Sequence, residues 1–335
     1  MLRSFVLSPY KKHMDPKIQI VAGSSNVRLA ESIADFLGIP LLQTKLQYFA
    51  DHEISVDIGE HVDGNHIFVI QSTCAPANDH IMELALIIDA LKRASAKAIT
   101  CVIPYFGYSR QDSVYPLQPL GDTEENNIIS YAPVSAKLIA NLLTMVGATR
   151  VLTLDLHSKQ MQGFFDIPIN NLLPSSVFVT DIKKKYDISS LTIVSPDIGA
   201  IARARVIANA LGAPLAIVDK RRESPGVSEA LRVIGDVSKR DCIIVDDIVD
   251  SASTICNAAS ALVNAGASSV VAHVTHGVLS SSAVESIESS VLLRLVITDS
   301  IVNQRKLHGC SKIEVISVAA LIADAIKSMV AAGRA

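Results

Sequence analysis

Three carboxylates and a run of small residues make one short stretch of the sequence chemically unusual. The apolar run 242–245 ends at Asp246 and Asp247. Two apolar residues and Asp250 follow, and then the small residues 251–254. Small residues let backbone N–H groups close around an anion, and the N-terminus of a following helix favours negative charge. A phosphate therefore fits the small residues, and sugar hydroxyls or a divalent metal fit the carboxylates.

The elements around this stretch alternate between strand and helix patterns. Short β-branched runs such as "HIFVIQS", "RVLTLDL" and "CIIVDD" are apolar on both faces, which is typical of parallel strands covered on both sides. Between them lie helical patterns, for example over 26–37, over 80–94 and from about Ile255. The alternation predicts an α/β protein with parallel sheets, in which ligands bind beyond the carboxyl ends of strands. The segment "FADHEISV" is interpreted as a further strand with alternating polar residues.

Composition limits the class of protein. The chain has 335 residues, of which 49% are hydrophobic, which is enough for a large core and more than one domain. Lys and Arg number 30 against 33 Asp and Glu, so no basic excess indicates nucleic acid. No apolar run reaches the roughly 18 residues that a membrane span needs. The five cysteines are scattered without a Cys-x-x-Cys pair, which is typical of reduced thiols in a cytoplasmic protein.

The sequence repeats itself in its two halves. "AESIADFLGIPL" begins at Ala30, and "ARVIANALGAPL" begins at Ala204. In each, a glycine (Gly38 or Gly212) ends the helical pattern and a proline follows before the next strand. Two similar α/β domains that arose by duplication explain the match. The alternative, that α/β units simply resemble one another, stays open at this point.

The repeat also gives the acidic stretch a counterpart. In the first half, "IFVIQSTCAPAND" keeps the strand, but Gln71 and Ser72 stand where Asp246 and Asp247 stand. A loop needed only for folding has less reason to differ in this way. The difference favours a ligand site in the second half over an ordinary strand–turn–helix connection with an aspartate N-cap.

Several motifs carry a resemblance to a known family. "VDDIVDSAST" resembles the phosphoribosyl-pyrophosphate loop, which phosphoribosyltransferases and PRPP synthetases share. Other segments resemble ribose-phosphate diphosphokinases, the PRPP synthetases: "YFGYSRQD", "TLDLHSKQMQGFFDIP", "SPDIG", "DKRR", "IGDV" and "THGV". The resemblance extends from about Ile18 to Ala319. It implies two similar phosphoribosyltransferase-type domains, each with a mainly parallel sheet flanked by helices.

The resemblance also implies domain limits and a reaction. We expect an extension over 1–17, an N-terminal domain over 18–160 and a C-terminal domain over 161–335, whose final helix is a candidate to pack on the N-terminal domain. Members of the family transfer the diphosphate of ATP to the C1 hydroxyl of ribose 5-phosphate, giving 5-phosphoribosyl 1-diphosphate and AMP for nucleotide biosynthesis. The alternatives are a phosphoribosyltransferase and a catalytically silent regulatory member of the family in a mixed oligomer.

The matched motifs assign roles to individual residues. Asp246 and Asp247 match the residues at the ribose hydroxyls. The loop that holds the 5-phosphate corresponds to Asp250, Ser251, Ala252, Ser253 and Thr254. His157 and Asp197 match the family's Mg²⁺ positions. Lys220 and Arg222 match the catalytic cations, which stabilise charge on the phosphates.

The nucleotide site is implied in the same way. Arg110, Gln111 and Asp112 match residues that contact ATP. Phe49, Asp51 and Glu53, which share one face of the predicted strand, match a nucleotide-binding segment contributed by a neighbouring subunit. The resemblance thus implies a homo-oligomer, hexameric or built from dimers, with ATP sites at a subunit interface and no nucleic-acid or membrane partner.

Three positions depart from the family pattern. Ser253 stands where the family has Gly, which matters if that residue needs a positive φ and not if it begins a helix. His52 also stands where Gly is common. The segment 113–132 is longer than usual and has no Lys or Arg, whereas the family has a short basic stretch there.

Overall fold

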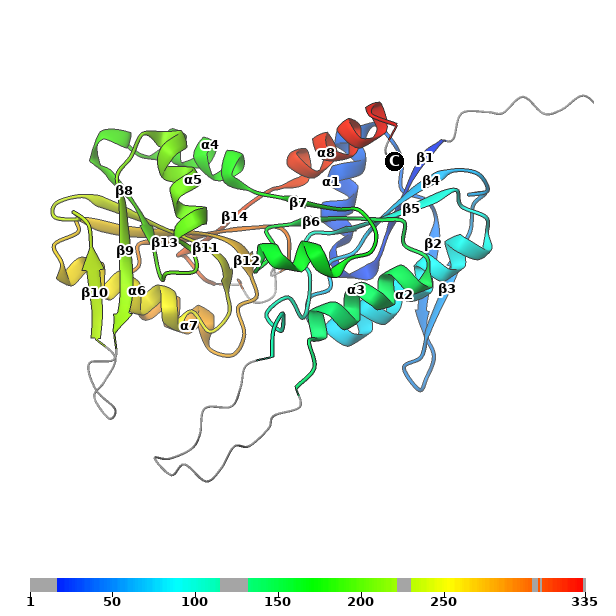
Figure 1. The fold of residues 1–335 in the computed structure, drawn as a ribbon, viewed down its shortest axis with the longest axis horizontal. Helices are drawn as coiled ribbons and strands as arrows, with labels where there is room; N and C mark the ends of the chain where they lie inside the picture. Colours follow the sequence, from blue (N-terminus) through cyan, green and yellow to red (C-terminus); the bar gives the residue numbers. More distant parts are fainter. Residues whose placement is uncertain (1–16, 115–131, 222–229, 303–306, 308, 334–335) are drawn as a thin grey trace, which may run out of the picture.

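The structure is a computed structural model that describes residues 17–114, 132–221, 230–302, 307 and 309–333 (Figure 1). Arg222, the predicted extension up to residue 16 and most of the acidic segment 113–132 lie outside the described residues. Among the described residues, no helix is both long and apolar enough to cross a membrane.

The first half forms a five-stranded parallel sheet in the order β1-β4-β5-β6-β7. Its strands are β1 (Ile18–Ala22), β4 (His66–Ile70), β5 (Ala98–Ile103), β6 (Arg150–Leu154) and β7 (Ile169–Leu172). A separate antiparallel hairpin of β2 (Thr44–Tyr48) and β3 (Ile54–Ile58) lies beside it. The buried β-branched and aromatic residues of β4 show why these runs form strands covered on both faces.

The second half forms a seven-stranded sheet in the order β10-β9-β8-β11-β12-β13-β14. Its strands are β8 (Leu191–Ser195), β9 (Leu215–Arg221), β10 (Ala230–Ile234), β11 (Asp241–Val249), β12 (Ser269–Gly277), β13 (Arg294–Thr298) and β14 (Ile313–Ile316). Only β10 runs antiparallel to its neighbour. The parallel strands β8-β11-β12-β13-β14 repeat the order of the first sheet, which supports the duplication inferred from the sequence.

Helices cover both faces of each sheet (Figure 1). They are α1 (Val27–Leu37), α2 (Ala77–Arg93), α3 (Ser135–Val146), α4 (Ser175–Lys185), α5 (Ile201–Leu211), α6 (Ser253–Asn264), α7 (Ala283–Ser289) and α8 (Ala319–Ala331). Short 3₁₀ turns are η1 (Ser24–Asn26), η2 (Lys159–Phe164) and η3 (Ile188–Ser190). The matched helices α1 and α5 both end at a left-handed glycine, Gly38 at φ 68° and Gly212 at φ 66°, as the repeat predicted.

The helix that ends each half packs on the other half. Helix α4 follows β7 of the first sheet, but its Phe178 and Ile182 lie in a core with α5 and β8. Helix α8 follows β14 of the second sheet, and its Ile322 and Ile326 pack against α1 and the first sheet, as anticipated. The first sheet also continues beyond residue 160, because β7 pairs with β6. Strand pairing therefore runs past the expected domain limit, and each half contributes a helix to the core of the other.

One predicted strand is wrong in part. Phe49, Asp51 and Glu53 do not share a strand face, because they lie in the turn between β2 and β3. The backbone N–H of Phe49 donates to the Glu53 carbonyl, and the Asp51 carboxylate accepts from the Glu53 N–H. His52 adopts φ 69°, the left-handed conformation in which glycine is favoured, so this departure from the family pattern is a strained one.

Candidate active site

The acid pair lies within β11 and not beyond its end. We expected the strand to stop at Asp246, but β11 continues to Val249 because it stays paired with β12 as far as Gly277. On its other side, pairing with β8 ends at Ile244. The pair therefore projects past the carboxyl end of β8. Asp246 and Asp247 are 9% and 5% exposed, so this is a recess and not a surface.

The conformation of the small-residue loop shows whether position 253 needs the glycine of the family pattern. Ser253 is the first residue of α6, two residues earlier than the sequence predicted for the helix start. The left-handed residue is Ala252, at φ 65° and ψ −2°. Ser253 therefore needs no glycine, and the hydroxyls of Ser251 and Ser253 lie 3.0 Å apart. The loop brings hydroxyls and the N-terminus of a twelve-residue helix to one place, which suits a phosphate.

Two basic side chains balance the acid pair. His157 Nδ1 lies 2.7 Å from Asp247 Oδ2, and Arg203 Nη1 lies 3.6 Å from Asp247 Oδ1 and 3.9 Å from Asp246 Oδ1. Burial alone would raise the pKa of Asp247, but the hydrogen bond from His157 and the charge of Arg203 outweigh burial and lower it. Burial and the charge of Asp247 raise the pKa of Asp246. The pKa values of the two carboxyls are therefore shifted in opposite directions.

Arg203 is a residue beside the acid pair that the sequence analysis missed. It lies in the first turns of α5, and its side chain is 16% exposed. Nothing in "IARARVIANAL" distinguishes it from Arg205, two residues along. The distinguishing signal is its contact with Asp155, at the carboxyl end of β6, which only the fold provides.

The two candidate metal ligands lie beside the acid pair. His157 contacts Asp247, and the charge of Asp197 contributes to the raised pKa of Asp246. Among the described residues, no group of three or more His, Cys, Asp or Glu side chains is arranged to hold a metal ion. Mg²⁺ usually takes only one or two carboxylates from a protein and completes its shell with phosphates and water. With Nδ1 donating to Asp247, the other ring nitrogen of His157 has its lone pair free for a cation, so the donor set fits.

Each residue of the predicted ATP trio makes its own contact. Arg110 Nη1 donates to Asp250 Oδ2 at 2.5 Å, which joins the first half to the small-residue loop. The Gln111 side chain accepts from Ser135. Asp112 accepts from Gln160 at 3.0 Å, and its charge contributes to the raised pKa of His157. Arg110 and Asp112 thus interact with residues of the acidic region, whereas Gln111 contacts the first residue of α3.

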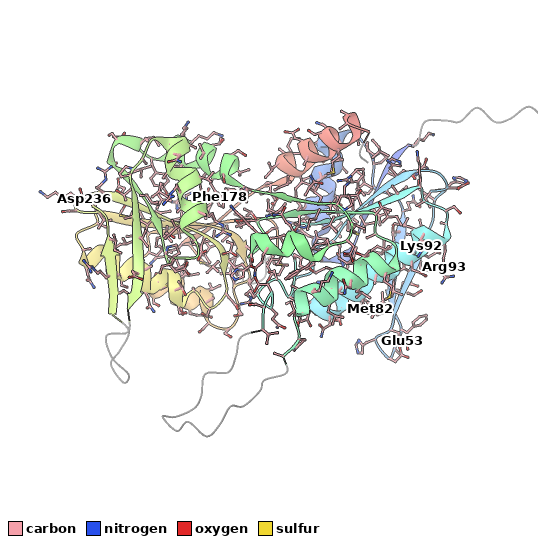
Figure 2. All side chains as sticks on the ribbon, viewed as in Figure 1. Glu53, Met82, Lys92, Arg93, Phe178 and Asp236 are labelled. Carbon is pink, nitrogen blue, oxygen red and sulfur yellow. The ribbon has the colours of Figure 1, made fainter. Side chains whose placement is uncertain are left out.

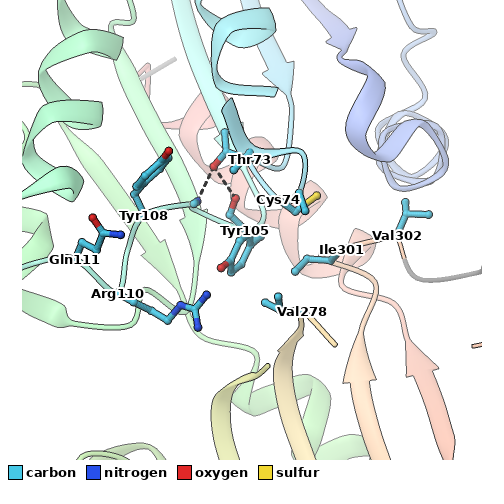
Figure 3. A pocket seen from close by; sticks show the side chains of 12 residues that line it. Thr73, Cys74, Tyr105, Tyr108, Arg110, Gln111, Val278, Ile301 and Val302 are labelled. Carbon is cyan, nitrogen blue, oxygen red and sulfur yellow. Dashed lines mark hydrogen bonds between the residues drawn. The ribbon is translucent and has the colours of Figure 1, made fainter. Parts of the chain in front are cut away.

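A cavity of about 320 Å³ lies next to this trio. Figure 3 shows Arg110 and Gln111 on one side of the cavity and Ile301 and Val302 on the other. Its remaining lining residues are Thr73, Cys74, Ala75, Ala77, Tyr105, Gly107, Tyr108 and Val278. The cavity therefore lies between the two halves, with both apolar and polar walls.

The other predicted residues lie on the two hairpins. Lys220 is the penultimate residue of β9, where it pairs with Leu231 of β10. Phe49 is 59% exposed. Figure 2 shows Glu53 at the free end of the first hairpin, on the side of the molecule away from the second sheet. The structure thus does not bring Phe49, Asp51 and Glu53 to the acid pair of the same chain.

Comparison with known proteins gives the same family for both halves. The family model for the N-terminal domain of ribose phosphate pyrophosphokinase matches residues 18–147. The model for the phosphoribosyl synthetase-associated domain matches residues 187–333. Together the two models span most of the chain.

Individual relatives agree. The chain is 51% identical to ribose-phosphate pyrophosphokinase of Agrobacterium fabrum, over 92% of this chain and 96% of that protein. It is 53% identical to the enzyme of that name from Brucella melitensis, with the same coverage. The crystal structure of phosphoribosylpyrophosphate synthetase from Mycobacterium smegmatis matches with a TM-score of 0.83 and 33% identity, over 94% of this chain and 99% of that one. The chain therefore belongs to the ribose-phosphate pyrophosphokinase family of enzymes.

Proposed function

We propose that the protein transfers the diphosphate of ATP to the C1 hydroxyl of ribose 5-phosphate, giving 5-phosphoribosyl 1-diphosphate and AMP. The C1 oxygen attacks the β-phosphorus, the bond from that phosphorus to the oxygen bridging the α-phosphate breaks, and AMP leaves with that oxygen. The C1 hydroxyl proton passes to solvent. The observation that supports this most is the contact of Arg110 with Asp250, which joins the predicted ATP residues to the predicted ribose 5-phosphate loop.

The second-half loop offers suitable groups to both parts of ribose 5-phosphate, the phosphate and the sugar. The residues 250–254 would hold the 5-phosphate through hydroxyls, backbone N–H groups and the N-terminus of α6. The acid pair would accept hydrogen bonds from ribose hydroxyls. Since Asp247 already accepts from His157 and lies beside the Arg203 guanidinium, its carboxylate repels an anionic sugar less than a bare one would.

The phosphates of ATP need cations around them. His157 and Asp197 would hold Mg²⁺ beside the acid pair, and the ion supplies charge that offsets the phosphate oxygens. Lys220, near the end of β9, and Arg222, two residues further along the sequence, would donate to the same oxygens. Cationic donors that meet the charge developing in transfer lower the barrier, because this reaction depends mainly on positioning and electrostatics.

The nucleotide would lie at a subunit interface. Arg110 and Gln111 line one wall of the cavity and would supply it from the chain that holds the ribose, with Asp112 next to them in sequence. Phe49, Asp51 and Glu53 lie in the turn of the first hairpin, and Glu53 marks its free end away from the second sheet (Figure 2), which supports their contribution to the site of a neighbouring copy. We therefore propose a homo-oligomer, hexameric or built from dimers. The described residues hold no disulfide bond, which supports the reducing cytoplasm as the proposed location.

An assay of AMP formation tests this proposal. Purified protein with ATP and Mg²⁺ should form AMP only when ribose 5-phosphate is added. Ribose-independent AMP, or none from folded protein, contradicts the proposal. The second result would favour a silent regulatory member of the family.

A further inference from the structure

Asp155 holds an unusual position at the end of β6. It is 1% exposed, and its φ of 43° lies in the left-handed region, which aspartate tolerates better than most residues. A buried carboxylate is costly unless it is paired and hydrogen-bonded. Its partners come from the other half of the molecule, so Asp155 connects the two halves at the acidic site.

The main partner of Asp155 is Arg203 of α5. Nε of Arg203 lies 3.1 Å from both carboxylate oxygens, and Nη2 lies 3.1 Å from Oδ1. This forked contact fixes the plane of the guanidinium as well as its position. One nitrogen, Nη1, stays outside the fork and faces the acid pair, at 3.6 Å from Asp247 and 3.9 Å from Asp246.

Asp155 is itself held by two residues of the "THGV" motif on β12. Thr275 Oγ1 donates to Asp155 Oδ2 at 2.5 Å. His276 Nε2 lies 3.1 Å from the Leu154 carbonyl oxygen and 3.4 Å from that of Asp155. Burial lowers the pKa of His276, so the neutral ring donates there from Nε2 and accepts from Ser300 at Nδ1. Side chain and backbone of Asp155 are therefore both fixed.

The distances explain why this matters for the acid pair. At 3.6 Å and 3.9 Å, Arg203 attracts Asp246 and Asp247 by charge but does not form a close hydrogen bond with either. A guanidinium free to rotate would move onto the pair and occupy the oxygens that ribose hydroxyls need. The fork with Asp155 prevents this movement, while the positive charge still faces the site.

We propose that Asp155 is a positioning residue for diphosphate transfer, which holds Arg203 so that its charge faces the acid pair without occupying it. The inference rests on the proposed function, because the acid pair is assigned there to ribose. Asp155 acts through Arg203 and does not touch substrate. Thr275 supports the same arrangement from β12.

A double-mutant cycle in the full-length enzyme tests the proposal. Asp155→Asn keeps the size and the tolerance of positive φ but removes the charge and one acceptor. We expect Asp155→Asn and Arg203→Lys each to lower kcat by at least about tenfold, measured well below the melting temperature. If Asp155 acts through Arg203, the kcat of the double variant should lie within about threefold of the kcat of the less active single variant. A merely structural role predicts that the two effects multiply, and that result overturns the proposal.

A milder variant keeps the test valid if Asp155→Asn does not fold. Thr275→Val removes only the hydroxyl that bonds Asp155 and should lower kcat about threefold or more, without further effect on the Arg203→Lys background. The matched control is Thr153→Val, since Thr153 is a buried β6 threonine whose hydroxyl donates to the Ile103 carbonyl. It should lower the melting temperature but not kcat. Equal kcat losses in Thr275→Val and Thr153→Val overturn the proposal.

The wild type separates this proposal from the proposed function. Ribose-dependent AMP formation upholds the function whatever the variants show, so multiplicative effects in an active enzyme overturn only the role of Asp155. An inactive wild type overturns the proposed function, and the positioning role is then overturned with it.

Discussion

The loops after β4 and β11 start from the same framework and use their polar groups in opposite ways. In the first half, the Gln71 amide is fully buried and accepts from the Ser25 N–H and hydroxyl. It also donates to Glu83 at 2.7 Å, and Glu83 accepts from Ser24. A Cβ on Gly23 would meet Gln71 Oε1 at 2.3 Å, so the side chain fills the recess down to the backbone. The first loop is closed by its own hydrogen bonds.

In the second half, nearby basic side chains balance the charges in the corresponding recess, but the recess is not closed off from solvent. Asp247 has His157 on one side and Arg203 at ion-pair distance on the other. His157 is 42% exposed, so the recess opens to solvent there. One duplicated loop thus satisfies its polar groups internally, whereas the other leaves part of its polar groups open to solvent.

The two hairpins differ in a related way. The hairpin of β9 and β10 is joined to its main sheet through β8, whereas β2 and β3 form a sheet of their own. Lys220 therefore lies on an extension of the sheet that carries the acid pair. Phe49 and its neighbours lie on a separate hairpin, whose free end points away from the second sheet. The first hairpin would thus serve a neighbouring copy, and the second hairpin the site of its own chain.

The largest effect should come from the second hairpin. Lys220→Ala should lower turnover at least about a hundredfold, because a charged donor to the reacting phosphates is lost. The melting temperature should change little. Lys45→Ala, in the exposed β2 strand of the first hairpin, is the matched control and should leave turnover unchanged. A mild effect of Lys220→Ala would remove it from the catalytic role.

The next largest effect tests whether the first loop is closed. Gln71→Glu replaces the amide donor to Glu83 with a second buried carboxylate. We expect the free energy of unfolding, measured by denaturant titration, to fall by about 3 kcal/mol. The same change at exposed Gln47 should have little effect. Unchanged stability of Gln71→Glu would mean that the recess admits water or ligand after all.

A smaller effect concerns pH, at a buried histidine that the first half does not repeat. By the internal repeat, Val102 stands where His273 stands. Burial lowers the pKa of His273, while Asp181, Lys185 and Glu314 surround it with charges of both signs.

Protonation of His273 therefore favours the unfolded chain. Because the folded pKa lies below the unfolded value of about 6.5, stability falls as pH decreases through that value. Melting curves from about pH 7 to about pH 5 should show this decrease, and His273→Val should make it shallower. An equal or steeper decrease in the variant would contradict the assignment.

The smallest effect is expected at Ser253. Because the left-handed residue is Ala252, Ser253→Gly should change the KM for ribose 5-phosphate by less than about threefold. Ala252→Val should be strongly destabilising by thermal melting, since a β-branched residue is strained at positive φ. A large gain of activity in Ser253→Gly would show that the loop needs glycine at that position.

The sequence predicted the elements well and the contacts between them poorly. Runs apolar on both faces located the parallel strands, and Gly38 and Gly212 located the ends of matched helices. The exchange of α4 and α8 was not predictable in full, because an amphipathic pattern does not say which half a helix covers. The turn at 49–53 was missed since its residues alternate as a strand would.

The site shows the same limit. Asp246 and Asp247 were found because their first-half counterparts are uncharged. Arg203 was not, because its role depends on Asp155 from the other half of the chain. Local pattern thus identified residues that differ between the repeats, and it did not identify residues defined by contact across them.

Calorimetric titration with ribose 5-phosphate tests the central claim most directly, that only the second-half loop binds the sugar. The wild type should bind one ribose 5-phosphate per chain. Affinity should fall at least about tenfold when Asp246→Asn and Asp247→Asn are combined, since the acceptors of the ribose hydroxyls are weakened. Undiminished affinity in that variant, or a second site per chain in the wild type, would contradict the account.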